Sequence, residues 1–153
     1  MVIVKFLHLM SLSIWVGSIV FFSFFAAPSI FKKLPRETAG DVVGDIFPKY
    51  RAIGYAGGAV TLLTLAIMMN SEKDSHYSRL VLLVLMTVVS LYSGLVTGKR
   101  AAFIKAEMRG AVLAEKKETL RLEFRKVHAI SSILNMGVLA LGIAFIFLTA
   151  MKL

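Results

Sequence analysis

The stretch LVLLVLMTVVSLYSGLVTG, residues Leu80–Gly98, decides the fold class. It carries no charged side chain over a length that, as an α-helix, covers about 28 Å, close to the thickness of the hydrocarbon core of a bilayer. Inside lipid, every backbone polar group needs a partner within the protein, which favours a helix. We therefore predict a transmembrane helix over these residues.

Three more apolar stretches share this character: Phe6–Phe31, Ala52–Met69 and Val127–Met151. Apolar residues make up 58% of the 153 residues, and the mean hydropathy is +0.78, above the range of ordinary soluble domains. The first stretch is longer than the apolar region of a typical signal peptide, so we expect it to be retained as a helix. The sequence predicts an all-α, integral-membrane four-helix bundle that forms one domain over residues 1–153.

The 18 lysine and arginine residues gather in two connecting segments. Residues 32–51 hold five of them and residues 99–126 hold nine, which leaves only Lys5, Lys73, Arg79 and Lys152 elsewhere. Short basic loops face the cytoplasm under the positive-inside rule, so we expect both termini to lie outside the cytoplasm, in a bacterial inner membrane. The net charge of +9 is therefore attributed to membrane topology, and with no recognisable nucleic-acid-binding motif we expect no nucleic-acid partner.

Both basic segments also carry helical signals. Pro35 suits a first helical turn and Pro48 suits a helix end, so we predict a short helix between them, either in the membrane interface or packed on the bundle. The charged residues of segment 99–126 have helical spacing, with Glu118 placed to pair with Arg121 and Glu123 with Lys126. Gly110 is the expected break, which predicts a helical hairpin between the third and fourth spans.

Polar and small side chains recur at helical spacing within three of the spans. Each set lies on one face of its predicted helix, and the set in the first span also includes two phenylalanines. The sets are His8, Ser11, Trp15, Ser18, Phe22, Phe25 and Ser29 in the first span, Thr87, Ser90, Gly94, Thr97 and Ala101 in the third, and His128, Ser131, Asn135 and Gly142 in the fourth. Turning polar groups toward lipid costs free energy, so we expect these stripes to face inward. They then serve either as hydrogen-bonding contacts between helices or, for the two histidines and Asn135, as a functional site.

The three histidines limit the metal and cofactor chemistry. In the predicted topology His8 and His128 lie near opposite ends of the bundle, so one haem or metal ion cannot be bound by both. His76, in a polar loop, lies closer in depth to His8, which leaves a His8–His76 site as one prediction. Imidazole and thioether groups favour soft ions such as Cu(I), and the chain has eight methionines, although methionine in an apolar helix more often fills space.

Three motifs carry a family resemblance over nearly the whole chain. They are Leu-Pro-Arg at Leu34–Arg36, Phe-Pro-x-Tyr at Phe47–Tyr50 and His-x-x-Ser-x-x-x-Asn at His128–Asn135. With the sequence around them, they resemble the transmembrane protein 205-like family (domain of unknown function 4149). This resemblance implies a four-span membrane protein without a settled activity.

A second resemblance covers less of the chain. The pattern His8-x6-Trp15-x-Gly17 is similar to the first helix of the copper-resistance CopD-like proteins and of the bacterial HemJ-type protoporphyrinogen oxidases. The oxidase resemblance implies that His8 is a haem ligand. That family has a lysine near residues 77–84, where this chain has Arg79, and an arginine stays protonated where a lysine can lose its proton.

These observations leave three functions open. The first is a membrane protein that binds or moves a small solute or a soft metal ion along its inward polar face. The second is a haem b-binding electron-transfer subunit or HemJ-like oxidase with His8 as an axial ligand, and copper is the other cofactor that the resemblance suggests. The third is a structural subunit, either as a homo-oligomer or within a larger membrane complex that its hairpin contacts.

Overall fold

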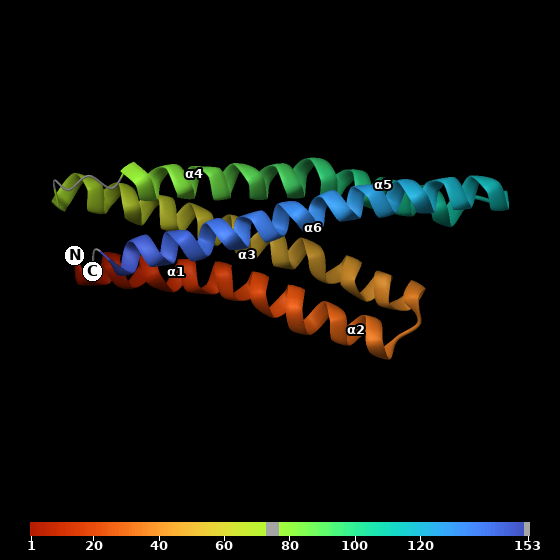
Figure 1. Cartoon of the computed structure of the whole chain (residues 1–153), viewed down its shortest axis with the longest axis horizontal. Coiled ribbons are helices and arrows are strands. Elements are labelled where there is room, and N and C mark those ends of the chain that lie inside the picture. Colours follow the sequence, from red (N-terminus) through yellow and green to blue (C-terminus); the bar gives the residue numbers. More distant parts are fainter. Residues whose placement is uncertain (73–76, 152–153) are drawn as a thin grey trace.

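A computed structural model describes residues 1–72 and 77–151 of the chain. In the described residues, four long helical segments form an up-and-down bundle, with both termini at one end and the hairpin at the other (Figure 1). The segments are α1 Val2–Val20 with the π-helical turn η1 Phe21–Ala26 and α2 Ala27–Lys33; α3 Arg36–Glu72; α4 Tyr77–Tyr92 with the π-helical turn η2 Ser93–Thr97 and α5 Gly98–Gly110; and α6 Ala114–Ala150. We call these two ends the terminal end and the hairpin end.

All four segments are long and apolar enough to span a membrane, and their most apolar windows have mean hydropathies of 1.8 to 2.3. At most 39% of each window is buried inside the bundle, so most of these apolar side chains point outward, as Phe24, Leu63, Ile133 and Phe147 do. An outward apolar surface of this extent suits lipid and would be unfavourable in water. The predicted all-α four-helix membrane bundle is confirmed.

The bundle core lies where the four segments meet. Segment α1 packs on α3, α4 packs on α6, and α3–α4 and α1–α6 contacts complete the ring. Its fully buried apolar side chains come from all four segments and include Leu12, Ile19, Leu65, Leu83, Met86 and Phe145. This core lies in the apolar half of the molecule and holds the polar groups described below in fixed positions.

The prediction of a separate short helix between Pro35 and Pro48 is wrong, because the helix does not end at Pro48. Helix α3 continues without interruption from Arg36 to Glu72 and contains Pro48. Ala39 and Val43 are buried before the proline, so this first part of α3 already packs against the bundle. Packing therefore keeps the helix continuous through Pro48, whose ring removes one backbone donor without ending the helix.

The predicted hairpin is confirmed, and its break lies at Gly110, where α5 ends. Ile104, Leu120 and Val127 form a small apolar core between α5 and α6. The expected pairing of Glu118 with Arg121 is present at 3.4 Å, whereas Glu123 pairs with Arg100 across the hairpin rather than with Lys126. The two helices of the hairpin are thus joined by both apolar and ionic contacts.

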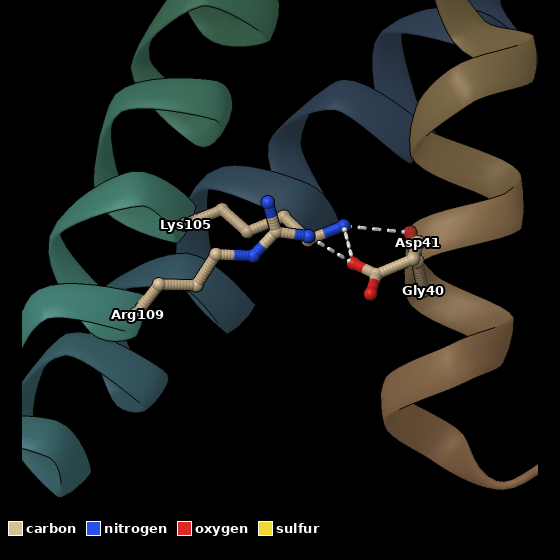
Figure 2. Close-up of polar contacts among 4 residues, drawn as sticks. All are labelled: Gly40, Asp41, Lys105 and Arg109. Carbon is tan, nitrogen blue, oxygen red and sulfur yellow. Dashed lines mark hydrogen bonds and ion pairs between the residues drawn. The ribbon is translucent and has the colours of Figure 1, made fainter.

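Asp41 connects the hairpin to α3. Figure 2 shows Lys105 and Arg109 reaching across from α5 to this carboxylate, at 2.7 Å and 2.6 Å. The Lys105 ammonium also donates to the Gly40 carbonyl at 2.9 Å. The hydrogen bond from Lys105, followed by that from Arg109, lowers the pKa of Asp41 below its ordinary value of 3.8.

This lowered pKa predicts a pH dependence of the contact between α3 and the hairpin. A carboxyl group with a depressed pKa contributes stability above its unfolded-state value, and that stability is lost as the pH falls through the folded-state value. We expect amide hydrogen exchange in residues 98–126 to accelerate as the pH falls below about 4, after correction for intrinsic rates. In Asp41→Asn the exchange should already be fast at pH 6, and an unchanged pH profile in that variant would contradict the prediction.

Candidate functional site

Trp15 lies against a surface of α3 that has no side chains. A Cβ atom built on Gly54, Gly57 or Gly58 would lie 3.0 to 3.2 Å from atoms of the Trp15 side chain. The indole is 2% exposed and thus fills the space between the two helices. Small residues at a helix contact let the backbones approach closely, and here they leave room for one large ring.

Three of the four segments are irregular near this ring. The first contains η1, the third contains η2, and α3 contains Pro48. A π-helical turn has one extra residue, so it frees backbone groups and rotates the following residues to a new face. Such turns are frequent at functional sites. The hydrogen bonds described next join all three irregular regions into one layer.

Asn135 of α6 is the centre of this layer. The Tyr50 hydroxyl donates to Asn135 Oδ1 at 2.6 Å, and Asn135 Nδ2 donates to the Ser23 hydroxyl of η1 at 3.0 Å. The Tyr50 ring stacks on Phe22, with 5.0 Å between ring centroids. One amide side chain therefore links the first, second and fourth segments.

Arg51 joins the second segment to the third. Its Nη1 donates to the Gly94 carbonyl of η2 at 3.1 Å. A Cβ atom on Gly98 would collide with the Arg51 guanidinium, and one on Gly94 would collide with the Tyr55 hydroxyl. The glycines of the Gly94-x3-Gly98 pattern thus form a notch that accommodates side chains from α3.

A small cavity lies within the layer. Its volume is about 30 Å³, which is room for about two water molecules. Its walls come from all four segments and combine aromatic, hydroxyl, amide and guanidinium groups, and the lining residues are Trp15, Ile19, Tyr50, Arg51, Gly54, Ser90, Ser93, Gly94, Asn135 and Val138. Hydrogen-bonding groups that converge on a cavity at membrane depth can bind a small polar molecule away from lipid.

His8 belongs to a second polar cluster, nearer the terminal end. It is buried, its Nδ1 lies 2.8 Å from the Thr64 hydroxyl, and its ring centroid lies 5.7 Å from that of Phe145. Because Thr64 donates to the Val60 carbonyl at 2.8 Å, its single proton is used there, and we assign His8 Nδ1–H as the donor to Thr64. Haem or copper ligation by His8 stays a prediction.

The other predicted residues of the polar stripe have different positions. Ser11 contacts Thr61 at 2.9 Å and Ser131 contacts Ser93 at 3.3 Å, both between helices. Ser18 donates to the carbonyl of Trp15 in its own helix, at 2.7 Å. Arg79 is buried in the first turn of α4. His76 lies outside the described residues, so the predicted His8–His76 site stays a prediction.

Three residues that the sequence analysis predicted to face inward are exposed, so the prediction is wrong for these three positions. His128 is exposed and stacks on Phe124, because the neighbouring Val127 takes the inward position on α6. Phe25 and Ser29 are also exposed. Regular helical spacing fails there because η1 inserts an extra residue after Val20 and rotates the rest of the segment.

Tyr50, Arg51 and Ser23 are central to the layer, and the sequence interpretation missed their role. Tyr50 and Arg51 were assigned to a loop, since basic residues and Pro48 precede the second apolar stretch. The glycines Gly54, Gly57 and Gly58, spaced on one helical face directly after them, were the available signal that another helix packs closely there.

Comparison with known proteins shows which family the chain matches. Residues 10–110 match the profile described as "Domain of unknown function (DUF4149)", which is well over half of the chain. The chain belongs to this family. The matched residues include Trp15, Ser23, Tyr50, Arg51 and the Gly94–Gly98 notch, so most of the layer lies inside the family domain, whereas Asn135 lies beyond the match.

One curated relative of the DUF4149 chain is an uncharacterized protein of Aquifex aeolicus (strain VF5). The two are 48% identical over 48 residues, which is 31% of this chain and 36% of the relative. The matched stretch thus spans about a third of the relative's length. No solved structure matches the chain.

The hydrogen bonds of Asn135 give a prediction for stability. Asn135→Leu removes the bonds to Tyr50 and Ser23 together, so we expect a loss of about 1–2 kcal/mol in the free energy of unfolding, since hydrogen bonds between membrane helices contribute about 0.6 kcal/mol on average. Ser132→Ala is the control, because among the described residues the exposed Ser132 bonds only to the carbonyl of His128 in its own helix. Steric trapping in bicelles measures both, and equal stabilities of the two variants would contradict the prediction.

Proposed function

We propose that this small polytopic membrane protein binds a small polar solute in the cavity between its four segments. The observation that carries the proposal is the convergence of Trp15, Tyr50, Arg51, Ser90 and Asn135 on one space inside the bundle. Helix contacts alone can use polar groups in pairs, but they do not require a space between the groups. The volume of about 30 Å³ limits the solute to the size of one or two water molecules.

The lining of the cavity favours a polar solute over a soft metal ion. The donors and acceptors around it are hydroxyl, amide, indole and guanidinium groups, whereas Cu(I) prefers thioether, thiolate and imidazole ligands. Within residues 1–72 and 77–151, no group of three His, Cys, Asp or Glu side chains is placed to bind one metal ion. The soft-metal form of the prediction therefore has less support than the polar-solute form.

The orientation of the protein in the membrane is part of the proposal. The hairpin end carries fourteen of the 18 basic residues, in segments 32–51 and 99–126. The positive-inside rule then favours a cytoplasmic hairpin end in a bacterial inner membrane, with both termini on the opposite side. The cavity, beside Tyr50 and Arg51 at the start of the second apolar stretch, would lie toward the cytoplasmic side.

Solute binding can be tested with the native fluorescence of the protein. Trp15 is the only tryptophan and forms part of the cavity wall, so its emission reports on the cavity without an added label. The purified protein in detergent is titrated with small inorganic anions and with methanol, a neutral solute of two heavy atoms. We expect a saturable change for at least one of these solutes, with reduced affinity in Asn135→Leu and unchanged affinity in Ser132→Ala. Only linear, unsaturable changes for all solutes in the wild-type protein would refute the proposal.

Cofactor binding and assembly, the other functions that the sequence left open, can each be tested separately. The resemblance to transmembrane protein 205-like, CopD-like and HemJ-like proteins, with haem b or copper at His8, stays a prediction. The protein purified from haem-replete cells would show a Soret band, which His8→Ala would abolish. Homo-oligomerisation or assembly into a larger complex is tested by the mass of the detergent-extracted particle, with and without residues 99–126.

A further inference from the structure

The chemistry of the cavity is dominated by one positive charge. Arg51 is half-buried, and its guanidinium has five N–H donors, of which one reaches the Gly94 carbonyl. In the part of the chain that the structure describes, no aspartate or glutamate forms an ion pair with Arg51, and every other lining residue of the cavity is uncharged. The cavity therefore has a net positive charge beside apolar surroundings.

The neutral groups around the cavity add further donors. Neither the Trp15 indole N–H nor the Ser90 hydroxyl makes a hydrogen bond to any described residue. Two acceptors nearby already receive a proton, since Asn135 Oδ1 accepts from Tyr50 and the Gly94 carbonyl accepts from Arg51. Donors that lack acceptors, beside a cation that lacks a counter-ion, favour a ligand that accepts hydrogen bonds and carries negative charge.

Resting on the proposed function, we propose that the solute is a small inorganic anion, of the size of a halide, bound by Arg51, Trp15 and Ser90. A partly buried cation interacts strongly with an opposite charge at close range because the effective dielectric constant there is low. The small volume of the cavity excludes a phospholipid headgroup. The basic residues of the hairpin end also raise the local anion concentration near this cavity.

The test follows binding by two readouts, the emission of Trp15 and the unfolding temperature. Wild-type protein is titrated with sodium chloride or sodium fluoride at constant ionic strength, with sodium gluconate, whose anion is too large for the cavity, as the replacement salt. Arg51→Gln removes the charge at the cavity. Lys49→Gln is the matched control, since the exposed Lys49 is two residues away on the same helix and contributes the same formal charge to the same end.

We expect saturable binding of one of these anions by the wild-type protein and by Lys49→Gln, with an unfolding temperature that rises with the logarithm of the anion concentration. Arg51→Gln should bind at least tenfold more weakly, and Arg51→Lys should fall between the two. If Arg51→Gln does not fold, Ser90→Ala provides the same test, because it removes one donor and should weaken anion binding several-fold.

Three results would overturn the inference. The first is equal anion affinity in Arg51→Gln and the wild-type protein. The second is binding of methanol but of neither anion, which would leave the proposed function intact and remove only its anionic form. The third is a phospholipid that copurifies with the wild-type protein, blocks the anion response and is lost in Arg51→Gln. Absence of any saturable solute response would instead remove the proposed function itself.

Discussion

Gly57→Leu lowers the free energy of unfolding by about 3 kcal/mol, the upper part of the range for overpacked cores. A Cβ atom on Gly57 would lie 3.0 Å from the Trp15 Cβ and 3.3 Å from the Ser11 carbonyl oxygen, before any further leucine atom is added. The second of these is a backbone atom, so a change of rotamer cannot relieve the contact. We therefore expect α1 and α3 to separate at this point.

The control for this variant is another glycine of the same bundle. A Cβ atom on Gly17 would have no atom within 4 Å, because Gly17 faces outward. Gly17→Leu should therefore leave the stability unchanged or raise it slightly, since leucine has a higher helix propensity than glycine. Both variants are measured by steric trapping in bicelles, and a Gly57→Leu protein as stable as Gly17→Leu would show that Trp15 does not pack as described.

Phe145→Ala is the second large effect, with an expected loss of about 2–3 kcal/mol. Phe145 has no exposed surface and packs beside His8 in the core. In soluble proteins a buried phenylalanine-to-alanine change costs about 3–5 kcal/mol, which includes the transfer of the ring to water. In a bilayer the separated helices expose that ring to lipid, so we count mainly the lost packing contacts.

Phe147 supplies the matched control for Phe145. It lies two residues further along the same helix and is 65% exposed, on the outward surface. Phe147→Ala should change the stability by no more than about 0.5 kcal/mol. If the two alanine variants were equally stable, the assignment of the inward face of α6 would be wrong.

The sequence was sufficient for the four spans, the hairpin break at Gly110 and the inward positions of His8, Ser11 and Trp15. These features depend on local composition and on regular helical spacing, which a single sequence displays directly. The start of the second helical segment was placed too late, because α3 begins at Arg36, well before the apolar stretch Ala52–Met69. Hydropathy marks where lipid is expected and carries no signal for a helix that continues into water.

The polar layer was only partly predictable, for a different reason. Asn135 was identified from its chemistry, but its partners Tyr50 and Ser23 are 85 and 112 residues away in sequence, and no local pattern relates them. The π-helical turn at Phe21–Ala26 also changes the helical phase, which is why Phe25 and Ser29 were assigned to the wrong face. Pro48 indicated a helix end in the sequence. In the structure the helix continues through Pro48, because the preceding residues Ala39 and Val43 pack against the bundle.

The central claim is that the four segments cross a bilayer with their apolar faces toward lipid and their polar layer inside. Because the chain has no cysteine, single-cysteine variants carry one nitroxide label each, and electron paramagnetic resonance then compares the accessibility of each label to oxygen and to a water-soluble nickel chelate. In liposomes, labels at Val88, Ile133 and Ile143 should be relaxed mainly by oxygen, whereas a label at Val112, at the hairpin tip, should be relaxed mainly by the chelate. Labels at Val88 and Ile133 that are relaxed mainly by the chelate would contradict the account.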